Sequence, residues 1–209
     1  MTKVKICGIT NLDDARRSME FGADMLGFNF YSKSPRCLSP SAAREIIGSL
    51  GTDVSMVGVF VNETVEHIVE TARFVGLDSI QLHGDESTQF VDDLRKETHC
   101  QIVKAVRVSD RFEWEDALDY NVHAILLDSF SAKGRGGSGE TFDWEIANSL
   151  WTMVGELWLA GGLTAANVRP AIRAVRPYAV DACSSLELRP GFKDPEKLRE
   201  FITEAKKND

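Results

Sequence analysis

The sequence has few cysteines, and their spacing does not suit a metal site. The four cysteines of the 209-residue chain stand far apart, at positions 7, 37, 100 and 183. The chain has no Cys-x-x-Cys pair and no cysteine–histidine cluster, so we expect no structural zinc and no other bound metal. Unpaired thiols are typical of a reducing compartment, and no signal-peptide pattern precedes the first apolar run. Both observations favour a cytoplasmic protein.

Long apolar runs and an excess of positive charge are also missing. No apolar run approaches the roughly 20 residues of a membrane-spanning helix. The 24 Lys and Arg residues against 32 Asp and Glu give a net charge of −8, which disfavours a nucleic acid or an acidic membrane as partner. An anionic small molecule would need backbone amides or a few arginines. We therefore expect a small-molecule ligand, and the sequence leaves a monomer and a homodimer both open.

Short apolar runs alternate with helical patterns along the whole chain. The apolar runs are continuous, as expected for strands that are covered on both faces. Residues that favour helix ends separate them, such as Asn11 at a start and Gly22 at a stop. The predicted strands comprise residues 4–7, 23–30, 54–61, 79–83, 102–106, 122–127, 157–160 and 178–181. The predicted helices comprise residues 12–21, a segment from residue 39 onward, 64–75, 86–98, 112–119, 144–153, 165–175 and 195–206.

One helix-to-strand junction occurs twice. Gly22-Ala23-Asp24 and Gly76-Leu77-Asp78 each place a helix stop, an apolar residue and an aspartate before a strand, which indicates stacked βα units. Eight strands alternating with eight helices, about 26 residues per unit, predict the α/β class and a (β/α)8 TIM barrel. A doubly wound open sheet is the rival, although it needs a switch point and rarely repeats so evenly. Without a linker or low-complexity segment, residues 1–209 are expected to form a single domain.

In such a barrel, the carboxyl ends of the strands converge on one mouth, where ligands bind. The residues with reactive or polar side chains at or just after these ends are Cys7, Asn29, Arg36, His83, Asp128 and Asp181. Each residue type also has a structural explanation. A cysteine near a strand end is often a small buried apolar group. An aspartate can cap a loop, a histidine before glycine can belong to a turn, and an arginine beside a proline can be a solvated charge.

A long glycine-rich segment follows Asp128. Residues 133–139 exceed the usual length of a βα loop, and we expect them to cover the mouth, with a plain flexible loop as the alternative. The residues that define this expected lid are Gly136, Gly137, Ser138 and Gly139.

Small residues also follow the last two predicted strands. Gly161 and Gly162 follow the seventh strand, and Ser184 and Ser185 follow the eighth. The loops after strands seven and eight are the usual phosphate site of these barrels. Backbone amides in such loops bind a phosphate without a net positive charge, so we expect a phosphorylated ligand.

Taken together, these segments resemble the phosphoribosylanthranilate isomerase family of tryptophan biosynthesis. The segments that carry the resemblance are Lys5-Ile6-Cys7-Gly8-Ile9-Thr10, Gln81-Leu82-His83-Gly84, Gly136-Gly137-Ser138-Gly139 with Phe142-Asp143-Trp144, and Ala160-Gly161-Gly162-Leu163. It extends to Pro190-Gly191 and Lys193-Asp194, and so covers nearly the whole chain. The resemblance implies an aldose–ketose isomerase. Its reaction is the Amadori rearrangement of N-(5-phosphoribosyl)anthranilate to 1-(2-carboxyphenylamino)-1-deoxyribulose 5-phosphate.

The resemblance also implies roles for the candidate residues. It makes Cys7 the general base and Asp128 the general acid. Arg36 matches the position that holds the anthranilate carboxylate, Asp181 lies beside the sugar, and His83 belongs to the substrate-binding residues. The residues that match the phosphate site are Gly161, Gly162, Ser184 and Ser185.

These roles agree with the chemistry of the side chains. Opening the ribose ring requires a proton on the ring oxygen, and a carboxylic acid whose pKa is raised by burial can supply it. Four apolar residues precede Asp128, which favours burial. The iminium that forms makes the sugar C2 proton acidic, and Cys7 can remove it if its pKa falls toward ~7 or below. The planar fork of Arg36 suits a carboxylate. The reaction needs no metal and no redox cofactor.

Two residues depart from the family pattern. Family members usually carry Ser-Ser-Gly-Val-Glu after the eighth strand, whereas this chain has Cys183-Ser184-Ser185-Leu186-Glu187. If position 185 required a positive φ, serine would cost on the order of 1 kcal/mol there. Cys183 would add a second thiol near the mouth.

Two other functions fit a barrel of this kind. Related sugar-phosphate enzymes include the histidine-pathway aminoaldose isomerase and indole-glycerol-phosphate synthase. These use carboxylates or lysine rather than a thiol on the first strand, so Cys7 distinguishes them. A binding or assembly protein that kept only the barrel would have lost part of the acid–base pair, and here both Cys7 and Asp128 are present.

Overall fold

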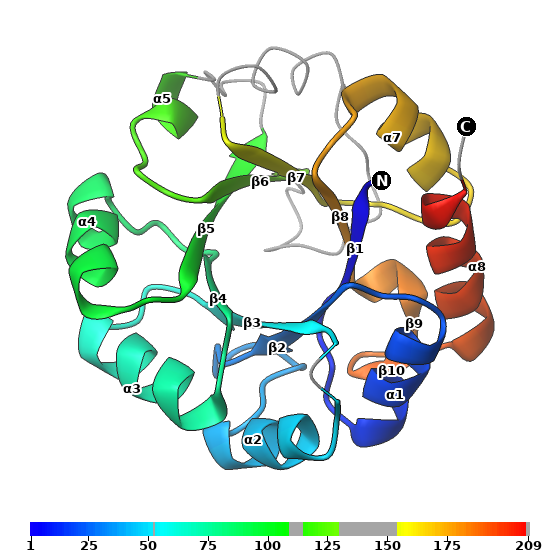
Figure 1. Ribbon diagram of the computed structural model, residues 1–209, viewed down its shortest axis with the longest axis horizontal. Coiled ribbons are helices and arrows are strands. Elements are labelled where there is room, and N and C mark those ends of the chain that lie inside the picture. The colour runs from blue at the N-terminus through cyan, green and yellow to red at the C-terminus, as the bar shows by residue number, and fades with distance from the viewer. Residues whose placement is uncertain (52, 109–114, 130–153, 208–209) are drawn as a thin grey trace.

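Eight parallel strands form a closed barrel in the order β1 to β8, which confirms the predicted (β/α)8 fold. The computed structural model describes the whole chain except residues 52, 109–114, 130–153 and 208–209 (Figure 1). The barrel strands are β1 (Lys3–Ile6), β2 (Met25–Asn29), β3 (Ser55–Phe60), β4 (Ser79–Leu82), β5 (Gln101–Val108), β6 (Ala124–Ser129), β7 (Glu156–Leu159) and β8 (Ala179–Ala182). Pairing of β8 with β1 closes the ring.

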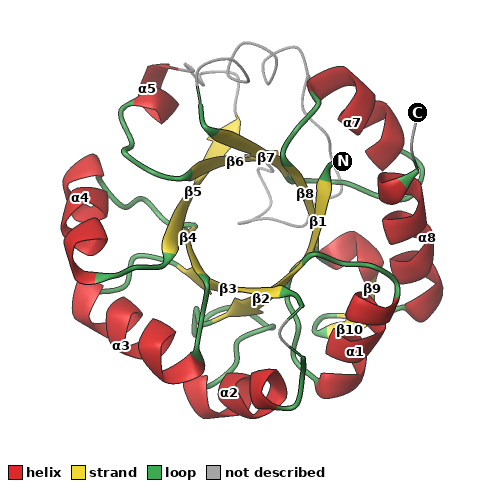
Figure 2. Cartoon of the chain, viewed as in Figure 1, coloured by secondary structure: helices red, strands yellow, loops and turns green. Residues whose placement is uncertain are grey.

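Helices surround the strands as an outer ring (Figure 2). They are α1 (Leu12–Glu20), α2 (Pro40–Gly48), α3 (Val65–Val75), α4 (Thr88–Glu97), α5 (Glu115–Leu118), α7 (Val168–Val175) and α8 (Pro195–Lys206). Several start where a polar side chain accepts a hydrogen bond from the first turn, as predicted for Asn11. The predicted helix 144–153 lies outside the described residues, as does the first part of the predicted helix 112–119.

The predicted helix 86–98 begins two residues later than expected. Ser87 is its N-cap and accepts a hydrogen bond from the amide of Phe90. Glu86 instead turns inward, where its carboxylate accepts a hydrogen bond from Lys104 Nζ at 2.8 Å. A buried ion pair therefore sets this boundary, which local helix propensity could not indicate.

The repeated aspartate of the two junctions has a structural role. Asp24 Oδ2 accepts a hydrogen bond from the amide of Val4 at 2.6 Å, and Asp78 Oδ2 accepts one from the amide of Met56 at 2.7 Å. Each aspartate thus ties the start of its own strand to the start of the preceding one. This is why the same junction occurs at both positions.

The strand residues divide between two apolar clusters according to which way they point. The small cluster contains alternate residues of neighbouring strands, among them Val103, Ala105, Ala124, Leu126 and Trp158. The large cluster contains the residues in between together with helix residues, among them Ile102, Ile125, Leu127, Leu94 and Phe201. Because successive strand side chains point to opposite faces, the small cluster fills the barrel and the large one packs the helices on the sheet.

A short hairpin follows the barrel and was not predicted. A single 3-10 turn, η1 (Ser184–Leu186), leads from β8 into β9 (Glu187–Arg189), which pairs with β10 (Phe192–Lys193). Gly191 makes the turn with a φ of 82°, a conformation that favours glycine. The hairpin returns the chain toward the barrel mouth before α8 begins. Among the described residues, no helix is both long enough and apolar enough to span a membrane.

Candidate active site

One pocket of about 380 Å³ lies at the carboxyl ends of the strands. This volume falls within the range of small-molecule sites. Every candidate residue that the structure describes lines it, namely Cys7, Asn29, Arg36, His83, Asp128, Gly161, Gly162, Asp181, Ser184 and Ser185. The expected lid residues Gly136, Gly137, Ser138 and Gly139 lie outside the described residues.

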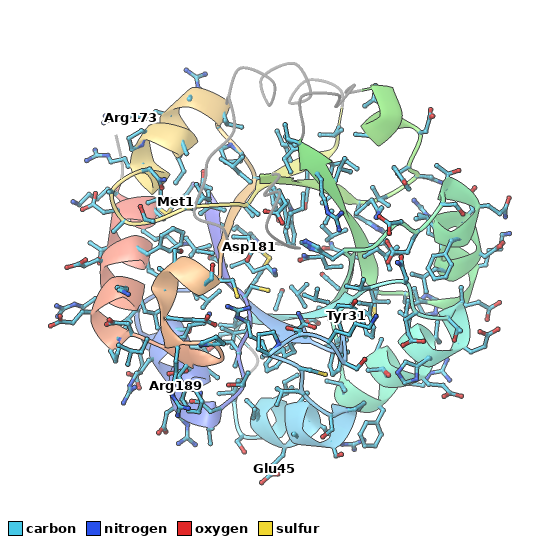
Figure 3. The ribbon with its side chains drawn as sticks, turned by 180° about the vertical axis from the view of Figure 1, so that it is seen from behind. Met1, Tyr31, Glu45, Arg173, Asp181 and Arg189 are labelled. Atoms are coloured by element: carbon cyan, nitrogen blue, oxygen red, sulfur yellow. The ribbon has the colours of Figure 1, made fainter. Side chains whose placement is uncertain are left out.

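Strand periodicity explains why these side chains meet. Leu126 belongs to the cluster inside the barrel, so Asp128, two residues further along β6, points to the same side. By the same alternation, Lys5 leads to Cys7 and Asp181 leads to Cys183. Figure 3 shows Asp181 within the ring of strands, while Glu45 and Arg189 lie at the periphery. The barrel order places β6 three strands from β1, so the pocket separates Cys7 from Asp128.

The thiol of Cys7 is not alone in the pocket. The amide of Cys7 donates a hydrogen bond to the carbonyl of Ala182 at 2.9 Å, which sets Cys7 beside Cys183. The hydrogen bond between the two thiols, followed by burial, raises the pKa of Cys7 well above its ordinary value and outweighs the nearby Lys5 charge. The same hydrogen bond lowers the pKa of Cys183 to about 7. Of the two thiols, Cys183 is therefore the more readily ionised.

Beneath Cys7, a buried ion pair joins neighbouring strands. Lys5 Nζ donates a hydrogen bond to Asp181 Oδ2 at 2.9 Å, and the lysine is 0% exposed. Burial acts most strongly to lower the pKa of Lys5, but the charge of Asp181, followed by the Cys7 side chain, outweighs it and raises that pKa. Asp181 Oδ1 is buried without a hydrogen-bond partner among the described residues. One oxygen of this pocket-lining carboxylate is therefore left for a ligand.

On the other side, three residues form a hydrogen-bonded chain. Gln81 Nε2 lies 2.9 Å from His83 Nδ1, and His83 Nε2 lies 3.2 Å from Asp128 Oδ2. When the amide donates to Nδ1, the neutral ring carries its proton on Nε2 and donates it to the carboxylate. Gln81 is 1% exposed, and its Oε1 has no partner in the described part of the chain.

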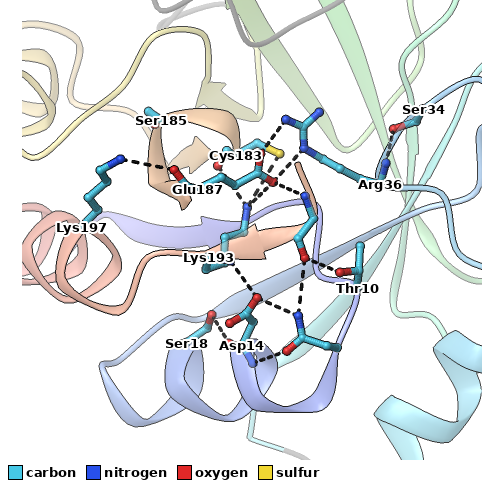
Figure 4. A network of polar contacts seen from close by, with 12 residues as sticks. Thr10, Asp14, Ser18, Ser34, Arg36, Cys183, Ser185, Glu187, Lys193 and Lys197 are labelled. Carbon is cyan, nitrogen blue, oxygen red and sulfur yellow. Dashed lines mark hydrogen bonds and ion pairs between the residues drawn. The ribbon is translucent and has the colours of Figure 1, made fainter. Parts of the chain in front are cut away.

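Arg36 is held by the carboxylate of Glu187, which no sequence pattern indicated. Its Nε and Nη2 donate to the two oxygens of Glu187 at 2.8 and 2.6 Å (Figure 4). The planar fork expected to hold a ligand carboxylate is thus used by Glu187, and Nη1 takes no part in this pair. Burial acts most strongly on Glu187 and opposes its ionisation, but Arg36 and Lys193 together hold its pKa below the ordinary value. Lys193 Nζ lies 3.3 Å from the same carboxylate.

The loops after β7 and β8 have backbones suited to a close ligand. Gly161 and Gly162 adopt φ values of 82° and 61°, which glycine accommodates without strain. Ser185 lies in η1 and is not among the positive-φ residues, so the expected cost of serine there does not arise. Its hydroxyl donates to the carbonyl of Leu163 at 2.5 Å and thereby joins the two loops.

The structure adds four polar residues that the sequence did not identify as part of the site: Lys5, Gln81, Glu187 and Lys193. The sequence did contain a signal for Lys5, which stands between two apolar residues of a strand. A lysine buried in this way almost always has an ionic partner. Glu187 and Lys193 reach the site through the hairpin, which no sequence pattern indicated. Among the described residues, no group of three or more histidine, cysteine or acidic side chains is gathered as a metal site.

Comparison with known proteins gives one consistent result. Residues 4–204 match the family model described as N-(5'-phosphoribosyl)anthranilate (PRA) isomerase. The chain is 48% identical over 207 residues to the N-(5'-phosphoribosyl)anthranilate isomerase of Citrifermentans bemidjiense, covering 99% of this chain and 98% of the other. It is similar to the crystal structure of the Thermotoga maritima enzyme, with 45% identity, a TM-score of 0.92 and 99% coverage of both chains.

A further similar structure contains a bound ligand. This phosphoribosyl anthranilate isomerase is in complex with reduced 1-(o-carboxyphenylamino)-1-deoxyribulose 5-phosphate. Its sequence identity to this chain is 44%, with a TM-score of 0.89 and 99% coverage of both chains.

Proposed function

The chain belongs to the N-(5'-phosphoribosyl)anthranilate isomerase family, and we propose that Cys7 and Asp128 perform the proton transfers of its reaction. It is an aldose–ketose isomerase of tryptophan biosynthesis. The reaction rearranges N-(5-phosphoribosyl)anthranilate to 1-(2-carboxyphenylamino)-1-deoxyribulose 5-phosphate. The observation that carries the assignment of the two residues is that both line one pocket from strands on opposite sides of the barrel.

The reaction needs an acid and a base on different sides of the sugar. Asp128 gives a proton to the ribose ring oxygen, the C1–O bond breaks, and an iminium forms between C1 and the anthranilate nitrogen. Cys7 then removes the proton from C2, and the electron pair of that C–H bond moves toward the iminium to form an enolamine. Tautomerisation of the enolamine gives the ketose. A positioned acid or base of this kind contributes about 10²- to 10⁴-fold to the rate.

The chain from Gln81 through His83 supports both protonation states of Asp128. When Asp128 is ionised, it accepts the Nε2 proton of His83. When Asp128 carries a proton, it donates to Nε2, and the ring proton moves to Nδ1. A half-turn of the Gln81 amide then presents Oε1 as the acceptor for Nδ1, which satisfies an oxygen that is otherwise without a partner among the described residues. The His83 ring can thus pair with Asp128 in both protonation states of the carboxyl group.

The remaining pocket residues bind the substrate in this proposal. The Nη1 of Arg36 faces the anthranilate carboxylate, while Glu187 fixes the guanidinium through its other two nitrogens. Asp181 Oδ1 accepts a hydrogen bond from a sugar hydroxyl, because the other oxygen is held by Lys5. The backbone amides around Gly161, Gly162, Ser184 and Ser185 hold the phosphate.

We further infer the setting in which the enzyme works. Residues 1–209 act as a single barrel domain, and the partner at the site is a sugar phosphate. The four cysteines are free thiols in the structure, which fits the cytoplasm as the compartment.

Substrate turnover tests the assignment. Freshly prepared phosphoribosylanthranilate loses its anthranilate-type fluorescence as it is converted, so the wild type, Cys7→Ser and Asp128→Asn can be compared in one assay. Both variants should turn over about 10²-fold slower or worse while retaining the wild-type circular dichroism spectrum. Turnover near the wild-type rate in either variant would show that its residue was assigned wrongly.

A further inference from the structure

Cys7 and Cys183 directly follow two neighbouring strands, β1 and β8, and lie side by side. In the parallel pairing of β1 with β8, Ile6 lies opposite Ala182. The next residue on each strand is a cysteine, and the hydrogen bond from the Cys7 amide to the Ala182 carbonyl continues the ladder. Neighbouring parallel strands lie ~4.8 Å apart, and both side chains line the same pocket. The two thiols therefore lie next to each other at the barrel mouth, and each affects the pKa of the other.

Two cations lie near Cys183. Lys193 Nζ is 3.9 Å from Cys183 Sγ and 3.0 Å from its carbonyl oxygen. Arg36 packs beside Cys183 as well, because a Cβ built on Gly8 would lie 2.7 Å from both Cys183 Sγ and Arg36 Cδ. Only glycine leaves room for this approach. Arg36 and Lys193 share one carboxylate, that of Glu187, so one positive charge among these groups is left without a counter-charge.

The ion pair beside Cys7 is balanced instead. Lys5 lies two residues before it on β1, and the lysine is paired with Asp181 on β8. The negative charge of Asp181 therefore offsets the effect of the Lys5 charge on the Cys7 thiol. A single negative charge on the thiol pair is favoured on Cys183, because its side of the pair has the excess positive charge.

We propose that Cys183 is a proton-holding residue that acts through Cys7: the resting pair has its thiolate on Cys183, and the proton of Cys7 crosses to Cys183 when the base is needed. This rests on the proposed role of Cys7. In the transfer, the S–H bond of Cys7 breaks and an S–H bond on Cys183 forms, so the pair keeps one negative charge throughout. Cys183 does not touch the reacting carbon and is a positioning residue.

The direction of the pKa shifts agrees with the charge balance. The pKa of Cys183 is lowered to about 7, first by the hydrogen bond from Cys7 and then by Lys193 and Arg36, against burial. The pKa of Cys7 is raised by the same bond and by burial. In the substrate complex, the anthranilate carboxylate compensates the charge of Arg36. That weakens the preference for a thiolate on Cys183 and makes Cys7 the base when substrate is present.

Thiolate absorbance in the ultraviolet tests the proposal without turnover. As pH rises, the wild type should gain one thiolate with a midpoint near pH 7, the lowered value for Cys183. Cys183→Ser should lose this step, because a serine hydroxyl does not ionise in this range. Cys37→Ser is the matched control, since Cys37 is exposed and has a raised pKa, and it should keep the step. A step that persists in Cys183→Ser would overturn the proposal.

The pH profile of turnover gives the second readout. The acid limb of kcat/KM should lie near pH 7 in the wild type and move upward by about one pH unit or more in Cys183→Ser, because Cys7 must then lose its proton to solvent. An unchanged limb would mean that Cys183 takes no proton.

The variant Cys7→Ser distinguishes a failure of this proposal from a failure of the base assignment. That variant keeps a hydroxyl donor beside Cys183, so it should lose turnover but keep the thiolate step. Full turnover in Cys7→Ser would refute the role of Cys7, and this proposal with it. Loss of turnover in Cys7→Ser, together with unchanged readouts in Cys183→Ser, would refute only the role of Cys183.

Alkylation of the wild-type protein tests the position of the thiolate without any variant. Limiting iodoacetamide at neutral pH, followed by peptide mapping, should label Cys183 faster than Cys7, since the thiolate is the reactive form. Faster labelling of Cys7 would contradict the proposal.

Discussion

His83 Nε2 lies 3.2 Å from Asp128 Oδ2, so a residue just beyond β4 contacts the carboxylate of β6 across the barrel mouth. Gln81 holds the other ring nitrogen from below. The carboxylate proposed as the acid is thereby paired with a ring whose neutral form can present either a donor or an acceptor to it. The consequences of this arrangement, and of the ion pairs around it, can be measured.

Replacing Asp128 with Asn should remove the acid while preserving the shape of the site. The Asn carbonyl still accepts the Nε2 hydrogen bond of His83, but the amide cannot donate a proton to the ribose oxygen. We expect kcat to fall about 10²- to 10⁴-fold, with a smaller change in KM. Steady-state fluorescence assays give both constants. A variant that kept more than about a tenth of the wild-type kcat would exclude Asp128 as the acid.

Replacing Gln81 with Leu should slow turnover without weakening substrate binding. The change leaves His83 Nδ1 without its buried partner, so the ring no longer holds a fixed protonation state toward Asp128. We expect kcat to fall about tenfold at nearly constant KM. Gln89→Leu is the matched control, because that glutamine lies on α4 and bonds only to Asp93 in the described structure. Equal kinetics for the two variants would mean that Gln81 is merely a packing residue.

The ion pair of Lys5 with Asp181 should matter most for stability. Lys5→Met leaves a buried carboxylate without its cation, which costs about 3–5 kcal/mol in such pairs. Adding Asp181→Asn should restore part of the free energy of unfolding, as measured by urea denaturation. Lys96→Met breaks a pair of similar length, 2.8 Å, at the surface and should leave stability nearly unchanged. If Lys5→Met were as stable as Lys96→Met, the buried pair would not stabilise the barrel.

Glu187 should make the enzyme less stable in acid. Its pKa is lower in the folded state than its ordinary value of 4.5. The stabilisation from its ionised form is therefore complete above pH 4.5 and is lost as pH falls through the lower folded pKa. Urea midpoints of the wild type and Glu187→Gln should differ at neutral pH and converge in acid. A difference that stayed constant with pH would show that the charge of Glu187 is not responsible.

Much of the fold was predictable, because it depends on local pattern. Continuous apolar strands, capped helix starts and the repeated aspartate junction indicated the barrel and the strand ends. Cys7, Asp128 and Asp181 could be named for the same reason, since a barrel brings the ends of all its strands to one mouth.

The charges that control the site were harder to predict. Glu187 and Lys193 depend on the path of a hairpin, and their pairing with Arg36 joins residues 151 positions apart in the case of Glu187. The proposed position of the thiolate depends on which cation is already paired, and that follows from three-dimensional contacts alone.

The single-turnover rate of Cys7→Ser tests the central claim most directly. A substrate deuterated at the ribose C2 should show a primary isotope effect in the wild type, because breaking that C–H bond requires the base. Under excess enzyme, which removes product release from the measurement, Cys7→Ser should convert substrate about 10³-fold more slowly while remaining folded. Conversion by Cys7→Ser within about tenfold of the wild type would contradict the account.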